Sequence, residues 1–272
     1  MVPEGQERNA ETRVNSILEI TLLGTGTSQG IPVIGCTCPV CISSDPRDTR
    51  LRTAAFIQVG ETGLAIDLGP DFRMQMLNNN LSDVHAVLLT HEHNDHISGL
   101  DDIRPINFRY KRNIPIYGSA RSLEEIKRRF FYAFDPDYIY PGKPHVTGVT
   151  INDDPFEIND ISIIPVPVDH GDLPIYGFRI GDLAYITDAK RIPEKSKKLL
   201  YNLDTLILNA LRIEPHDAHL NIEEAIEIVK ELKPRQCFLT HISHATGLHA
   251  DIDKLLPEGI KLGFDGLRLR LS

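Results

Sequence analysis

Long hydrophobic runs are missing from this 272-residue chain. A membrane-spanning helix needs about 20 consecutive apolar residues, and no run in the sequence comes close to that length. A secretory signal joins a basic segment to a hydrophobic core, and the N-terminal residues show neither feature. These absences argue against a membrane span and a secretory leader, so we expect a cytoplasmic protein with no membrane partner.

Basic residues are also scarce relative to acidic ones. Lysine and arginine number 29 against 38 aspartates and glutamates, which gives a formal net charge of −9. Affinity for a phosphate backbone comes largely from lysine and arginine, so this balance disfavours non-specific binding of nucleic acid. We therefore expect no stable nucleic-acid partner.

Cysteine occurs only four times. Cys36, Cys38 and Cys41 fall within six residues, too close together for a set of spread disulfide bonds. The spacing C-x-C-x-x-C indicates a metal site, with a redox-active trio as the alternative. Three thiolates need a fourth donor to complete a closed structural zinc site, and His244 is the candidate. Cys237 lies alone in an apolar segment, which predicts a buried core thiol.

No repeat, low-complexity tract or linker divides the chain. A hydrophobic content of 41% over this length is enough for one large core. Residues 1–15 are polar and lack periodicity, which predicts a mobile tail, with an interaction arm as the alternative. Residues 16–272 are predicted to form a single domain.

The segment from His91 to His96 reads H-E-H-N-D-H and directly follows an apolar run. Its three imidazoles and one carboxylate are donors that suit zinc, manganese and iron. His91 and His93 can point at one ion, while Asp95 and His96 can reach a second, which predicts a binuclear site. The alternative is a set of polar residues on a solvated loop, but burying so many titratable groups without a metal would be costly.

The pattern H-x-H-x-D-H resembles the signature of the metallo-β-lactamase superfamily, most of whose members are binuclear hydrolases. The resemblance covers nearly the whole chain and implies an α+β fold, a metallo-β-lactamase-like αββα sandwich of two mixed sheets with helices outside. It implies three further ligands at the ends of apolar segments: His170 for the first ion, Asp188 as a bridge, and His241 for the second ion. Asp67 matches an aspartate that orients a ligand imidazole, with a plain strand-end residue as the alternative.

Three further features narrow the resemblance: a glycine-rich segment up to Gly30, the cysteine cluster, and the sequence T-H-I-S-H that ends at His244. Together they look like the cyclic phosphodiesterases of the carbon-phosphorus lyase pathway. That similarity implies hydrolysis of a small cyclic phosphodiester, such as 5-phosphoribosyl 1,2-cyclic phosphate or a cyclic nucleotide. It implies attack on phosphorus by hydroxide shared between two divalent ions, manganese or zinc, beside one structural zinc. A homodimer is also expected.

The glycine-rich segment itself is not a dinucleotide-binding loop. Gly24, Gly26 and Gly30 miss the spacing G-x-G-x-x-G, and Pro32 with the cysteines follows where a helix should begin. We expect a tight turn beside the active site.

His219 is the main candidate for a catalytic residue outside the metal ligands. It precedes a late helix that Asn221 is expected to cap. The resemblance places it on a histidine that contacts the phosphate or protonates the leaving oxygen, with a structural loop histidine as the alternative. His216 is the weaker candidate, and Asp95 is assigned to the catalytic residues as well as to the second ion.

Polar residues just after the metal motif border the substrate in one interpretation and form a solvated helix start in the other. These residues are Asp101, Asp102, Arg104 and Asn107.

Apolar alternation and turn residues predict the secondary structure. The expected strands are Ile17–Leu23, Thr53–Val59, Leu64–Asp67, Val84–Leu89, Ile114–Tyr117, Val146–Ile151, Pro155–Ile158, Ile161–Val168, Ile175–Ile180, Leu183–Ile186 and Gln236–Thr240. The expected helices are a stretch through Asn107–Tyr110, then Ser119–Phe131, Asn221–Leu232 and Leu248–Leu255.

Two other functions stay open. A nuclease like the tRNA 3′-processing enzymes of the same superfamily would share the ligand set, although this chain lacks the Gly- and Lys-rich arm of that class. A non-catalytic metal-binding or partner-binding module would use the same scaffold, although the presence of seven candidate ligands argues against it.

Overall fold

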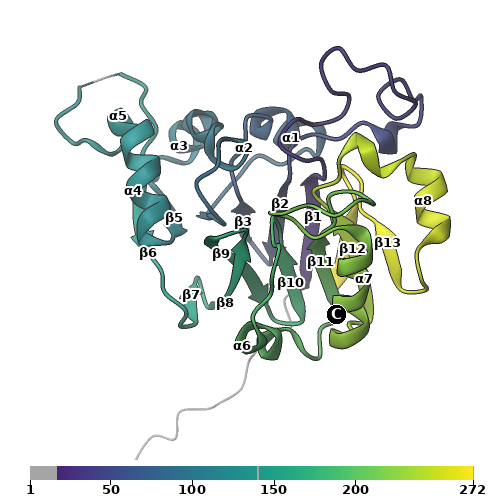
Figure 1. The fold of residues 1–272 in the computed structure, drawn as a ribbon. Helices are drawn as coiled ribbons and strands as arrows, with labels where there is room; N and C mark the ends of the chain where they lie inside the picture. Colours follow the sequence, from purple (N-terminus) through teal and green to yellow (C-terminus); the bar gives the residue numbers. More distant parts are fainter. Residues whose placement is uncertain (1–16, 140, 272) are drawn as a thin grey trace, which may run out of the picture.

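Two mixed β-sheets pack face to face in the computed structural model, which describes residues 17–139 and 141–271 (Figure 1). Within these residues each sheet has seven strands, in the orders β14-β1-β2-β3-β4-β5-β6 and β13-β12-β11-β10-β9-β8-β7. Helices cover the outer face of each sheet, so the predicted αββα sandwich is confirmed. The predicted tail, residues 1–15, lies outside the described residues.

The strands of the first sheet are β1 (Leu18–Gly24), β2 (Ala54–Val59), β3 (Thr62–Ile66), β4 (Ala86–Leu88), β5 (Ile114–Gly118), β6 (Val146–Thr150) and β14 (Arg268–Leu271). Those of the second sheet are β7 (Phe156–Ile158), β8 (Ile161–His170), β9 (Leu173–Ile180), β10 (Leu183–Ile186), β11 (Thr205–Asn209), β12 (Gln236–Thr240) and β13 (Ile260–Leu262).

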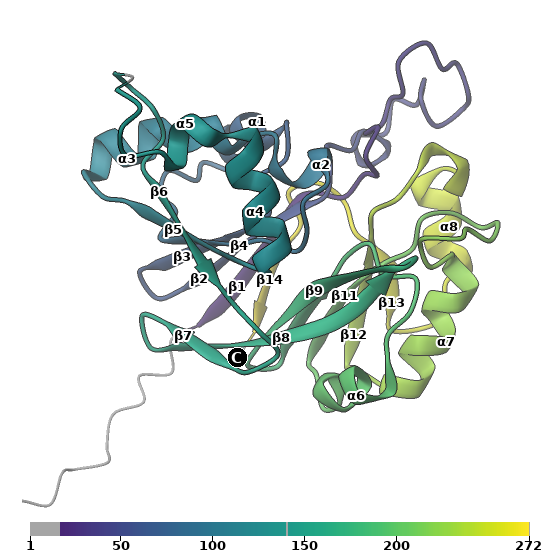
Figure 2. The same cartoon turned by 60° about the vertical axis from the view of Figure 1, so that its left-hand side comes forward.

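The helices divide between the two outer faces. Figures 1 and 2 show α1 to α5 over the first sheet and α6 to α8 over the second. Their bounds are α1 (Phe72–Asn78), α2 (Asn94–Ile97), α3 (Arg104–Tyr110), α4 (Ala120–Arg129), α5 (Phe131–Phe134), α6 (Glu194–Lys197), α7 (Ile222–Leu232) and α8 (His249–Leu255). In the part of the chain that the structure describes, none of them is both long and apolar enough to cross a membrane.

The two longest helices begin at polar caps. Asn221 accepts a hydrogen bond from the Glu224 N–H, and the Glu224 carboxylate accepts one from the Asn221 N–H, which completes a capping box at the start of α7. Ser119 accepts from the Ser122 N–H at the start of α4. Both caps satisfy backbone N–H groups that a helix leaves without partners, so the helix starts are fixed by local sequence.

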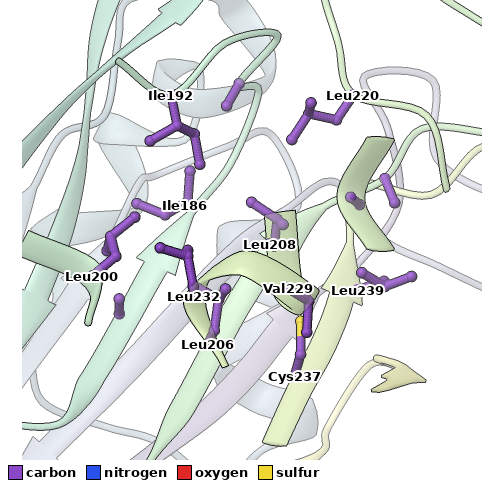
Figure 3. Packing of buried hydrophobic residues seen from close by; sticks show 14 of the residues in the cluster. Ile186, Ile192, Leu200, Leu206, Leu208, Leu220, Val229, Leu232, Cys237 and Leu239 are labelled. Carbon is purple, nitrogen blue, oxygen red and sulfur yellow. The ribbon is translucent and has the colours of Figure 1, made fainter. Parts of the chain in front are cut away.

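Apolar side chains fill three layers. The layer between the sheets includes Ile20, Leu64, Tyr185 and Phe238, all buried. A second layer lies under α1 to α5, and a third lies between the second sheet and the helices outside it. Figure 3 shows this third layer, where Cys237 packs among leucine, isoleucine and valine side chains. Cys237 is 1% exposed, which confirms the predicted core thiol.

The sequence missed several elements, among them α1, α6, β11, β13 and β14. β11 is the most important of them, because it pairs in parallel with both β10 and β12 in the interior of the second sheet. The ends of each predicted element lie within three residues of those observed.

Candidate metal centre

The candidate ligands converge because their strands end at one edge of the sandwich. β3 and β4 are parallel neighbours, and so are β10, β11 and β12. β8 is antiparallel to β9, which is antiparallel to β10, so β8 and β10 also end on the same side. The residues that these strand ends carry are Asp67 after β3, His91 after β4, His170 in β8, Asp188 after β10 and His241 after β12.

Three of these residues leave their strands in the left-handed backbone region. The φ angles are 66° at Asp67, 58° at Asp188 and 57° at His241. Residues other than glycine adopt this region infrequently, and it tends to occur at functional sites, where surrounding structure enforces it. Each strand end therefore turns abruptly and directs a polar side chain toward the same place.

Donor atoms gather in two groups at this edge. The three-histidine group consists of His91, His93 and His170, and its ligand atoms lie within 4.8 Å of one another. His91 Nε2 and His93 Nδ1 are 3.0 Å apart. Two nitrogen ligands on one tetrahedral ion lie about 3.3 Å apart when each bond is about 2.0–2.1 Å, so the spacing fits a shared ion.

The mixed group consists of Asp95, His96, Asp188 and His241. Asp188 connects it to the first group: Oδ1 is 3.5 Å from His96 Nε2, while Oδ2 is 3.2 Å from His241 Nε2 and 4.0 Å from His91 Nε2. Asp95 Oδ2 lies 3.3 Å from His96 Nε2. Asp188 is the residue whose carboxylate faces donors of both groups.

Hydrogen bonds on the far side of three rings decide which nitrogen faces the centre. Asp67 Oδ2 lies 2.7 Å from His96 Nδ1 and accepts the Thr90 hydroxyl at 2.8 Å, which leaves the Thr90 oxygen to accept from His91 Nδ1 at 3.0 Å. His170 Nδ1 donates to the Ala218 carbonyl at 2.8 Å. In all three rings the proton is on Nδ1, so the Nε2 lone pair is directed at the donor group.

Buried ring nitrogens in the centre have no hydrogen-bond partner, although carboxylates lie near them. His96 Nε2, both ring nitrogens of His241 and His219 Nδ1 are in this state among the described residues. Burial opposes a positive charge on His96. The carboxylates of Asp188, Asp67 and Asp95 outweigh this effect and raise the pKa of the His96 imidazole well above its ordinary value. Lone pairs without hydrogen bonds and a surplus of carboxylates favour a cation, so the donor set fits divalent ions.

His219 borders the centre on the side of Asp188. Its Nδ1 is 3.9 Å from Asp188 Oδ2, and its ring lies 4.5 Å from that of His170 and 4.7 Å from that of His241, measured between centroids. Burial, followed by the neighbouring His241, lowers the pKa of His219 to about 3. The His216 ring is 5.1 Å from that of His219.

Cys36, Cys38, Cys41 and His244 form a separate cluster. The three Sγ atoms lie 3.3, 3.5 and 3.5 Å from His244 Nδ1. A tetrahedral zinc with Zn–S bonds of about 2.3 Å and a Zn–N bond of about 2.0–2.1 Å separates nitrogen from sulfur by about 3.5 Å. The cluster therefore has the dimensions of a closed zinc site.

The glycine-rich segment lies between the two sites. Gly26 forms isolated bridges with Arg52 and with Ile242, the residue after His241. The Thr27 N–H donates to the Ile242 carbonyl at 3.0 Å. A Cβ on Gly24 would lie 2.0 Å from the Arg52 carbonyl oxygen, so this close approach requires glycine.

The sequence predicted that Asn107 either borders the substrate or lies at a solvated helix start, and the structure shows neither. Asn107 is 4% exposed, and its amide donates to the carbonyls of Arg112 and His145, so it is neither a substrate residue nor part of a solvated helix start. Asp101 accepts from the Tyr132 hydroxyl. Sequence reasoning also missed Ala218, whose role depends on a backbone carbonyl and therefore leaves no trace in residue type.

The family model described as a beta-lactamase superfamily domain matches residues 62–242. The chain belongs to this superfamily. The match runs from β3 to Ile242 and so includes every residue of the three-histidine and mixed groups. The superfamily and the fold that the sequence predicted are both confirmed, and the fold implies divalent metal ions.

Two relatives share 39% identity with this superfamily member. One is an octanoyltransferase from Porphyromonas gingivalis, matched over 250 residues that make up 90% of this chain and 50% of the relative. The chain thus spans half the length of that relative. The other is a crystal structure of a new diphosphatase from the PhnP family, with a TM-score of 0.88 over 94% of this chain and 97% of the other.

A more distant likeness concerns the fold alone. The structure of human tRNase Z, short form, has a TM-score of 0.67 and 18% identity, over 92% of this chain and 98% of the other.

Proposed function

We propose that the protein is a metal-dependent phosphodiesterase that hydrolyses a small cyclic phosphodiester, such as 5-phosphoribosyl 1,2-cyclic phosphate or a cyclic nucleotide. The observation that carries the proposal is the pair of donor groups joined by Asp188. Its support from comparison is the 39% identity to a PhnP-family diphosphatase over nearly the full length of both chains.

The residues of the centre would have three separate roles. The three-histidine and mixed groups would hold two divalent ions, which when bound activate water and neutralise charge on the phosphate oxygens. Asp67, Thr90 and the Ala218 carbonyl keep the ligand imidazoles in the required tautomer. His219 is a neutral imidazole because of its low pKa, so it would donate a hydrogen bond to an oxygen of the phosphate ester, and it would donate a proton when the negative charge of a bound phosphate raises that pKa.

A second candidate is hydrolysis of a diphosphate bond. The specific observation in its favour is the activity named for the PhnP-family neighbour. Both reactions place water in line with a phosphorus atom and need the same ions, so the ligand set does not separate them. The likeness to tRNase Z is one of fold, and the net charge of −9 disfavours a nuclease that holds a long substrate. The match to the octanoyltransferase does not support octanoyl transfer by this protein, because half of that relative lies outside the match.

A hydrolysis panel on metal-loaded protein tests the proposal. Phosphoribosyl cyclic phosphate, a 2′,3′-cyclic nucleotide, a dinucleoside diphosphate, a linear diester and precursor tRNA are compared by kcat/KM with manganese or zinc present. We expect a cyclic phosphodiester to give the highest value. Preference for the diphosphate would select the second candidate. Inactivity towards every compound, with two ions bound at the centre, would leave a non-catalytic metal-binding module.

Replacing His219 with alanine should lower kcat about a hundredfold, within the range that a positioned proton donor contributes. The cause would be the loss of a donor next to the phosphate rather than the loss of an ion, so metal content should stay at the wild-type value. His216→Ala is the matched control and should change kcat severalfold at most. If His219→Ala loses an ion, this histidine is a ligand, since His170, Asp188 and His219 lie close enough together for one.

A further inference from the structure

Glu92 separates two ligands of the three-histidine group, and its side chain points away from them. The Glu92 carboxylate is 13% exposed and meets the first turn of α4. The Arg121 Nε lies 3.1 Å from Glu92 Oε1, and Arg121 Nη2 donates to Oε2 at 3.3 Å. The Ser122 hydroxyl donates to the same Oε2 at 2.8 Å. The stretch between His91 and His93 is therefore attached to α4 by charge-assisted contacts.

The same guanidinium also contacts the hairpin that carries the third histidine. Arg121 Nη2 donates to the Pro174 carbonyl at 3.0 Å. Pro174 pairs with Asp169 in the β8–β9 hairpin, directly beside His170. One planar cation thus links the segment that holds two histidines to the hairpin that holds the third, a geometry that a guanidinium provides and an ammonium does not.

We propose that Arg121 is a positioning residue for the three-histidine group, and that it sets the affinity of one of the two ions. The inference rests on the metal centre of the proposed function, and it goes beyond the ligands to a residue that touches none of them. Among the described residues, the hydrogen bonds and ion pair of Arg121 go to Glu92 and Pro174, and none goes to a member of the mixed group.

Another contact limits the size of the effect. The Tyr176 N–H donates to the Thr90 carbonyl at 3.2 Å, so the hairpin stays attached to the segment before His91 when Arg121 is changed. Arg121 is 41% exposed, which allows its charge to be removed without opening a cavity in the core. We therefore expect about a tenfold loss of affinity for one ion, at the low end of the effect of residues that support metal ligands.

The test measures metal binding on the full chain, by competition with a chelator and by mass spectrometry of the folded protein. Arg121→Met should weaken binding of one catalytic ion about tenfold and leave the other ion and the zinc of the cysteine cluster unchanged. The affinity of Arg121→Lys for that ion should lie between those of the wild type and Arg121→Met, because lysine can reach Glu92 or Pro174 but not both in one plane. Arg128→Met is the control, since Arg128 lies on the same helix and pairs only with Glu125 in the contacts described.

A variant that already lacks one ligand of the three-histidine group identifies which ion Arg121 affects. His93→Ala removes a ligand of the three-histidine group, so in that variant the remaining ion should bind equally well with or without Arg121→Met. Wild-type affinity for both ions in Arg121→Met would overturn the proposal, and so would a further loss in the His93→Ala background. The readout needs no turnover: an inactive wild-type protein that loses one ion in Arg121→Met would refute the proposed function and leave this inference standing.

Discussion

Replacing Asp188 with alanine should abolish hydrolysis, with a fall in kcat/KM of at least about a thousandfold. The Asp188 carboxylate faces both donor groups, with His91 of the three-histidine group on one side and His96 and His241 of the mixed group on the other. Its removal would weaken both ions together. Metal ions contribute several kcal/mol of transition-state stabilisation to such reactions, and about 1.4 kcal/mol corresponds to a tenfold change in rate.

Metal analysis and kinetics on the same preparation check this result. Asp188→Ala should retain the zinc of the cysteine cluster and lose the catalytic ions at concentrations that saturate the wild type. Asp182→Ala is the control, because Asp182 lies in an exposed turn after β9 and its carboxylate pairs with Arg179 at 3.5 Å. A variant at Asp188 that keeps two catalytic ions would show that each donor group holds its ion independently.

The sequence predicted the candidate donors of both groups because several of them follow a strand that is apolar enough to recognise. His91 follows β4, Asp188 follows β10 and His241 follows β12, and all three strands are wholly buried or nearly so. Residue type and spacing then indicate metal chemistry without any knowledge of the fold. Assigning donors to two ions required the resemblance to the superfamily as well.

The elements that were missed lack such a pattern. β11 is buried on both faces, so it has no polar alternation that would distinguish a strand from part of a helix. α1 has seven residues, too few for a helical period to repeat more than once. The edge strands β13 and β14 have three and four residues and depend on pairing with β12 and β1. Their existence is decided by tertiary contacts.

The partners that orient the donors were equally beyond prediction. The Ala218 carbonyl and the Arg121 guanidinium act across 48 and 29 residues of sequence, and neither belongs to a motif. The left-handed backbone at Asp67, Asp188 and His241 is likewise imposed by the strands packed around each turn. The sequence pattern therefore identifies the candidate metal donors, while the fold determines their geometry.

The cysteine cluster is connected to the catalytic centre by short and specific paths. His244 follows His241 by three residues. Between them, the Ser243 N–H donates to the Leu211 carbonyl at 2.9 Å, and just after His244 the buried Thr246 hydroxyl donates to the same oxygen at 3.0 Å. Leu211 begins the loop that carries His219. A zinc at this cluster would hold the segment that positions both a candidate ligand and the candidate proton donor.

Replacing Cys38 with serine should remove the zinc and lower both stability and activity. The cysteine loop has little apolar support of its own, since Ile34 is fully exposed and Ile42 is 68% exposed. Structural zinc contributes its binding free energy to folding, about 10–16 kcal/mol in isolated zinc-finger peptides. We expect a loss of at least about 2 kcal/mol in this larger domain, which corresponds to a fall in Tm of roughly 4–8 °C. Loosening of the segment around Ser243 should reduce kcat about tenfold.

Zinc content, thermal unfolding and kinetics of Cys38→Ser are measured beside Thr37→Ser, a change at the neighbouring exposed position of the same loop. The control should match the wild type in all three, because Thr37 donates no ligand to the cluster. A Cys38→Ser protein with full zinc, normal Tm and normal activity would contradict the assignment of the cluster. If Cys38→Ser loses zinc and has a lower Tm but keeps its kcat, the catalytic centre keeps its geometry without the zinc. The hydrogen bonds to the Leu211 carbonyl would then not couple the cysteine cluster to the catalytic centre.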